Sequence, residues 1–167
     1  MKNVFSNQKL REEYLAYSEE RVSSFANPLS ITLTFIGSSD KAKSEAQERF
    51  NTLRHKLSSR FIRNKYKRRG LLIDCVAVIE HDDHTRPHIH AIFDIPENTD
   101  KQTFLTVLKE KTDYLCDLRQ GFIKERYLKI KPKIEVSKFN SAARAVGYIM
   151  KKETKDNRIN FSEFVIA

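Results

Sequence analysis

The sequence has little of what marks membrane, secreted or disulfide-bonded proteins. Its 167 residues contain no long hydrophobic run and only two cysteines, four glycines and four prolines. No apolar run approaches the roughly 20 residues of a membrane span, and the first residues lack the apolar core of a secretory signal, so we expect a cytosolic protein. Cys75 and Cys116 have no CxxC or Cys-His spacing. We therefore expect two buried free thiols rather than a disulfide framework or a cysteine zinc site.

Composition favours one packed domain with a polyanionic partner. A hydrophobic content of 40% with so little glycine and proline is typical of a folded globule, and we expect residues 1–167 to form a single domain. Lysine and arginine total 31 against 22 aspartates and glutamates, a net charge of +9. This excess favours nucleic acid first and an anionic membrane surface second.

Hydrophobic periodicity predicts an α+β domain built on an antiparallel sheet. The predicted elements are a helical arm at 5–24, a strand at 29–36, a helix at 38–67, strands at 71–80 and 88–95, a helix at 99–118, a strand at 126–136, a helix at 140–152 and a short strand at 158–166. After the arm, the order βαββαβ is that of a ferredoxin-like, RRM-like split βαβ sheet. Such a sheet packs helices on one face, and we expect the other face to be free for a ligand. Pro132 lacks an amide donor, which puts the strand at 126–136 at a sheet edge.

The segment from Glu80 to His90 predicts a metal site. Strand side chains alternate, so His88 and His90 share one face. In a hairpin that turns over residues 81–87, Glu80 lies opposite or nearly opposite His88, on the same face by parity. Two nitrogens and a carboxylate suit Mn²⁺ or Mg²⁺, and histidine-rich sites also take Zn²⁺. The alternative interpretation is a pair of ordinary surface or core histidines.

A second pattern centres on Tyr148, in the helix predicted at 140–152. At about 100° per residue the apolar side chains of this helix, Val146 among them, fall on one side and Tyr148 falls on the other. Four cations lie near the tyrosine at helical spacing: Arg144, Lys151, Lys152 and Lys155. Positive charge favours the phenolate, which is the nucleophilic form, and attracts phosphate. The alternative is a solvated basic helix face that happens to carry a tyrosine.

These two patterns together resemble motifs of the HUH endonucleases. The segment from Pro87 to His90, followed by a hydrophobic strand, resembles motif II, and Tyr148-x-x-Lys151 resembles motif III. Residues 30–35 are compatible with motif I. The likeness covers about residues 29–155, whereas residues 1–27 form a helical extension with no counterpart.

The resemblance is to single-tyrosine replication initiators (Rep proteins) of small viruses and plasmids. It implies that Glu80, His88 and His90 bind a divalent metal, that Tyr148 attacks a DNA phosphodiester, and that Lys151 helps to hold phosphate or metal. Position 144 is arginine, so the second tyrosine of some phage initiators is absent. Such a protein works in the cytoplasm of a bacterial or archaeal cell, or in the host cell of a virus.

Basic residues offer candidate DNA contacts on the sheet as well as on the tyrosine helix. In the strand predicted at 126–136, lysines alternate with apolar residues, as on a surface that follows a nucleic-acid backbone. The predicted DNA-binding residues are Lys129, Lys131, Lys133, Arg144 and Lys152. Any half-exposed antiparallel sheet shows such alternation. The basic run at 60–69 either contacts the DNA backbone or is a solvated helix end.

The predicted function is sequence-specific nicking and joining of single-stranded origin DNA through a 5′-phosphotyrosine, to start rolling-circle replication. No GxxxxGK[ST] motif occurs, so we expect a host helicase and polymerase to act with the protein, unless the sequence is part of a longer chain. No membrane partner is expected. Alternatives are a transposase or relaxase with the same chemistry, a non-catalytic nucleic-acid-binding module, and a metal-dependent hydrolase that activates water.

Overall fold

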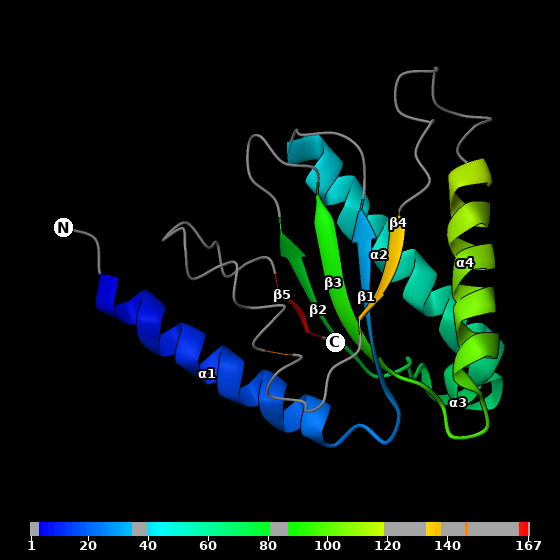
Figure 1. Ribbon diagram of the computed structural model, residues 1–167, viewed down its shortest axis with the longest axis horizontal. Helices are drawn as coiled ribbons and strands as arrows, with labels where there is room; N and C mark the ends of the chain where they lie inside the picture. The colour runs from blue at the N-terminus through cyan, green and yellow to red at the C-terminus, as the bar shows by residue number, and fades with distance from the viewer. Residues whose placement is uncertain are drawn as a thin grey trace.

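The computed structural model describes residues 4–34, 40–80, 87–118, 133–137, 146 and 164–166. Within them, helices and strands follow one another in the order αβααββαββ (Figure 1). The elements are α1 (Val4–Ser23), β1 (Pro28–Thr34), α2 (Asp40–Phe61), α3 (Arg63–Arg69), β2 (Cys75–Glu80), β3 (His88–Asp94), α4 (Lys101–Leu118), β4 (Lys133–Ser137) and β5 (Phe164–Ile166).

The strands form one antiparallel sheet in the order β4-β1-β3-β2-β5. Setting aside α1, the short α3 and β5, the chain runs βαββαβ with its four strands in the order 4-1-3-2, which is the ferredoxin-like arrangement. The predicted fold class is therefore confirmed. β4 is an edge strand, as predicted from Pro132, although Pro132 itself lies outside the described residues. The predicted C-terminal strand is present as β5, paired with β2.

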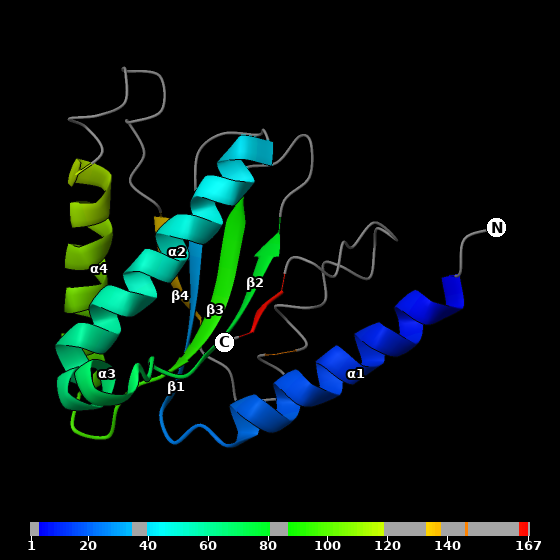
Figure 2. The same ribbon diagram turned by 180° about the vertical axis from the view of Figure 1, so that it is seen from behind.

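One face of the sheet carries the main hydrophobic core. Figure 2 shows α2 crossing this face, with α4 beside it. Phe50 of α2 and Phe104 of α4 both contact Phe93 of β3, with ring centroids 5.9 and 5.8 Å apart. The strands contribute fully buried residues of one parity: Leu29, Ile31, Leu33, Ala77, Ile79, Ile89, Ala91 and Phe93. Each large side chain buried here stabilises the fold by roughly 1.5–3 kcal/mol.

The single helix predicted at 38–67 is wrong, because the chain breaks at Ile62. There φ is −123° and ψ is 37°, outside the helical region, and α3 starts one residue later. Phe61 and Ile62 both pack against the core. Neighbouring side chains on a straight helix point about 100° apart, so burying both favours a change of direction between them. α3 ends at Gly70, whose φ of 65° suits glycine and whose N–H donates to the carbonyl of Tyr66.

β2 begins at Cys75 rather than at the predicted Leu71. Both backbone groups of Ile73 bond to α2 instead of extending the strand: Arg54 Nε donates to its carbonyl at 2.9 Å, and its N–H donates to Ser58 Oγ at 2.9 Å. The neighbouring Cys75 is a buried free thiol, as predicted, and burial raises its pKa to about 12. The Cys116 side chain lies outside the described set.

The opposite face of the sheet is not wholly free, in contrast to what we predicted. Val76, Val78 and Ile92 are apolar on this side and need cover. They form a second buried cluster with Val22 and Phe25 of the α1 region and with Val146. The described helices also give no segment long and apolar enough to cross a membrane.

Val146 is the one described residue of the helix predicted at 140–152. It is helical and fully buried, so it lies on the packing side as predicted. The remainder of that predicted helix is outside the described residues.

Candidate active site

The β2–β3 hairpin brings the predicted metal ligands into register. Glu80 pairs with His88 and Val78 pairs with His90. Directly paired residues of an antiparallel ladder share a face, so the positions of Glu80, His88 and His90 are all on the face opposite α2 and α4. The predicted placement of Glu80 opposite His88 is confirmed for the backbone. The Glu80 side chain lies outside the described set.

The two imidazoles lie side by side. Their ring centroids are 6.4 Å apart, with 33° between the ring planes. His90 is 8% exposed, and His88 is half-buried. Two rings that share one ion, at about 2.1 Å from each nitrogen, lie somewhat closer together. Joint binding therefore requires a rotation of one or both side chains on a backbone that the ladder holds in place.

A threonine that the sequence analysis did not single out holds one of these histidines. Thr32 pairs with His90 across β1 and β3, and its Oγ1 lies 3.0 Å from His90 Nδ1. When Nδ1 carries the proton it donates to this hydroxyl, and the lone pair is then on Nε2, the nitrogen that would face an ion. Outer partners of this kind fix the tautomer and orientation of ligating histidines. In the sequence, Thr32 differs from other residues only in belonging to the hydroxyl-bearing positions that alternate with apolar residues along its strand.

The ladder also defines rows of positions across this face. One row runs Lys133, Thr34, His88, Glu80, from β4 to β2. The next row contains Glu135, Thr32, His90 and Val78. The backbone of Lys133, a predicted DNA contact, thus shares a row with His88, while Val136 and Ile134 pair with the buried Ile31 and Leu33. The predicted alternation of β4 is confirmed for these residues.

A comparison with family models identifies the kind of protein. The model for the replication-associated protein ORF2 family matches residues 28–157, well over half of the chain. The chain belongs to this family of replication-associated proteins. Comparisons with curated proteins and with solved structures gave no match.

Membership of the replication-associated protein family confirms the predicted resemblance to replication initiators, and it implies DNA binding. The matched region begins with β1 and contains both the histidine pair and Tyr148. It leaves out α1.

The predicted site residues of this replication-associated protein are placed to different extents. His88 and His90 are described with their side chains, whereas only the backbone is described for Glu80 and Lys133. The other predicted catalytic and DNA-binding residues lie outside the described residues: Tyr148, Lys151, Arg144, Lys152, Lys129 and Lys131.

Two observations bear on the metal site as a whole. Among the side chains that the structure describes, no group of three or more histidines, cysteines, aspartates or glutamates gathers, and the third predicted ligand, Glu80, is not in that set. Val146 belongs to the apolar cluster with Val78 and Ile92. Val146, the one described residue of the predicted tyrosine helix, is therefore buried on the face that carries the histidines.

Proposed function

We propose that this replication-associated protein nicks and rejoins single-stranded DNA to start rolling-circle replication, using Tyr148 as nucleophile and Glu80, His88 and His90 as metal ligands. The observation that carries the proposal is the shared face: two adjacent imidazoles, a carboxylate position in register with one of them, and the buried Val146 of the tyrosine helix.

Chain connectivity supports the placement of the nucleophile. Val146 is buried beside Val78, which pairs with His90. Tyr148 is two residues further on, and two residues span at most about 7 Å. About 200° of helix rotation separates the two positions. A helix through this segment would hold Tyr148 and its neighbouring cations away from the apolar cluster, on the side where a DNA strand bound at the histidines would pass.

The donor set fits a divalent ion, since two imidazole nitrogens and a carboxylate suit Mn²⁺ and related ions, with Mg²⁺ as the alternative. When bound, such an ion would polarise the scissile phosphate. The Thr32 hydroxyl at Nδ1 presets the orientation of His90.

The covalent step exchanges one phosphoester for another. The Tyr148 phenol loses its proton and its oxygen attacks phosphorus, while the bond to the 3′ oxygen breaks and that oxygen takes up a proton. The products are a 5′-phosphotyrosyl protein and a free 3′-hydroxyl. Arg144, Lys151 and Lys152 favour the phenolate and hold the phosphate. Because one ester bond replaces another, the step is reversible and permits joining.

The proposal extends to the DNA path and to partners. Lys133 on the histidine row, with Lys129 and Lys131 before it, would follow the strand backbone through phosphate contacts. A host helicase and polymerase would unwind the template and extend the 3′-hydroxyl in the cytoplasm.

Covalent trapping tests the nucleophile. Incubation with a mixed pool of single-stranded oligonucleotides and Mn²⁺ should give a protein–DNA species on a denaturing gel, and adding a strand with a free 3′-hydroxyl should give a joined product. Tyr148→Phe removes one oxygen and should abolish adduct and cleavage together. Tyr127→Phe and Tyr114→Phe are the matched controls and should leave both intact.

Two results would contradict this assignment. A nucleotide-modified peptide that lacks Tyr148 would mean that another residue attacks. Cleavage without any adduct or joining would instead identify a hydrolase that activates water.

A further inference from the structure

Helix α3 is an unusually dense group of exposed cations. Five of its seven residues, RNKYKRR, are lysine or arginine, and Arg60 precedes them at the end of α2. All six cations are exposed. Among the described residues, none of them has a carboxylate within ion-pair distance. Holding six like charges together without partners disfavours the fold slightly, which is the expected cost of a surface that binds an anion.

The two aromatic residues of this basic run, Phe61 and Tyr66, each contact another ring of the protein. Phe61 stacks on Phe104 with ring centroids 5.2 Å apart. Tyr66 meets His55 of α2 edge-on, with centroids 6.0 Å apart and its hydroxyl 3.4 Å from Nδ1. Both rings are half-buried and already contact another ring, so little of either surface is left to stack on a base. What this surface offers is therefore positive charge, which recognises phosphate and not sequence.

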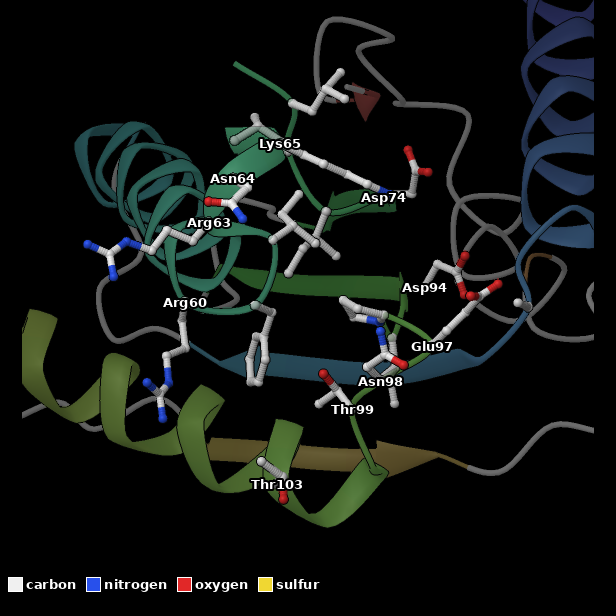
Figure 3. Close-up of a pocket in the computed structure, with 18 of the residues that line it drawn as sticks. Arg60, Arg63, Asn64, Lys65, Asp74, Asp94, Glu97, Asn98, Thr99 and Thr103 are labelled. Carbon is white, nitrogen blue, oxygen red and sulfur yellow. The ribbon is translucent and has the colours of Figure 1, made fainter. Parts of the chain in front are cut away.

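A hollow of about 860 Å³ beside α3 separates this basic side from an acidic side. In Figure 3, Arg60 and Arg63 lie on one side of the hollow, and Asp94 and Glu97 lie on the other. Three acidic residues that line it are already bonded within the fold: Asp74 pairs with Arg21, Asp94 accepts the N–H of Asn27, and Asp100 caps α4 through Thr103. The hydrogen bonds from Thr103 lower the pKa of Asp100. Three of the carboxylates thus already have partners within the fold, whereas the six cations have no ion-pair partner among the described residues.

The basic surface is remote from the histidine pair. β3 runs from His88 to Asp94, which lines the hollow, so at about 3.3 Å per residue Asp94 lies roughly 20 Å from His88 and roughly 13 Å from His90 along the strand. Figure 1 shows α3 at the end of the sheet where β3 ends, opposite the end where β3 begins. For a duplex flank, which rises about 3.4 Å per nucleotide, these distances correspond to roughly four to six nucleotides.

We propose that Arg60 and the cations of α3 bind the phosphate backbone of DNA that flanks the nick, several nucleotides from the scissile phosphate. This inference rests on the proposed function, because it takes the histidine face as the cleavage site. The surface would add affinity and hold the flank in place without reading its sequence. The flank is either duplex or single-stranded, and the two forms differ measurably in their salt dependence.

A matched pair of variants tests the surface. Lys65→Gln/Lys67→Gln neutralises two exposed lysines of α3, and Lys109→Gln/Lys111→Gln neutralises two lysines of α4. Residue types and charge change are the same, and glutamine is about as good a helix former as lysine. Binding of a labelled mixed-sequence duplex, and of the corresponding single strand, is measured over a range of salt concentrations in EDTA, so that no cleavage occurs.

The α3 variant should weaken binding and flatten the plot of log K against log salt. The slope should fall by about 1.8 for a duplex, or by about 1.4 for a single strand, if both lysines contact phosphate. The α4 variant should keep the wild-type slope. Oligonucleotides too short to reach from the histidines to α3 should be bound and cleaved by the α3 variant as they are by wild type.

Three results would overturn the proposal: an unchanged slope in the α3 variant, an equal fall in the α4 variant, or preferential binding of anionic lipid vesicles through α3. The test is independent of cleavage. If wild type forms no adduct but the α3 slope still falls, the proposed chemistry fails and the DNA-binding surface stands.

Discussion

The two faces of the sheet differ in what they bury and in what they can do. The face under α2 and α4 is apolar along β1, β2 and β3, from Leu29 to Phe93. The other face is apolar only near Val76, Val78 and Ile92, and polar near Thr32 and the histidines. Within one strand, residues of one parity therefore pack in the core, and residues of the other parity carry the groups of the candidate active site. Thr32 and His90 can be buried on this face because their side chains are hydrogen-bonded to each other.

The largest effect on stability is expected on the apolar face. Phe93 is fully buried between Phe50 and Phe104, so Phe93→Ala should lower the free energy of unfolding by about 3–5 kcal/mol. Urea denaturation followed by circular dichroism measures this loss. Ser30→Ala, on the other face, is the control and should cost far less. Equal losses would show that the two faces contribute alike to stability.

Substitutions of the histidines on the other face should impair function rather than stability. His88→Ala/His90→Ala should abolish Mn²⁺ binding and cleavage, because both nitrogen ligands are lost, while single-stranded DNA binding persists through the lysines. Isothermal titration with Mn²⁺ and a gel-shift assay separate the two properties. Full cleavage by this variant in metal-free buffer would remove the metal site from the mechanism.

Features that depend on residues close together in the chain could be predicted from the sequence alone. Strand parity placed His88 and His90 on one face, and the short connection of the hairpin placed Glu80 opposite His88. Asp100 as a cap and Gly70 as a helix end also follow from local chemistry. These elements need no knowledge of the rest of the chain.

Features that depend on distant contacts were missed. The helical pattern continues through Ile62, and only the shared core reveals why the helix breaks there. Leu71 has strand character, but side chains of α2 form hydrogen bonds with both backbone groups of Ile73, which are then not free to extend the strand. The Thr32–His90 contact joins residues 58 positions apart, and no local pattern gives the register between β1 and β3.

The smallest effect concerns that same contact. Thr32→Val keeps the β-branched shape but removes the hydroxyl, which leaves His90 Nδ1 without this partner and its ring orientation less fixed. Mn²⁺ affinity should fall by about tenfold, at the low end of what the loss of an outer partner produces, with DNA binding in EDTA unchanged. Thr32→Ser retains the hydroxyl and should restore most of the affinity. Ser30→Ala, two residues away on the same face and paired with Ile92 rather than with a histidine, should leave the affinity as in wild type. If Thr32→Ser loses as much affinity as Thr32→Val, the methyl group and its packing matter rather than the hydrogen bond. Thr32 would then stabilise the strand without positioning the ligand.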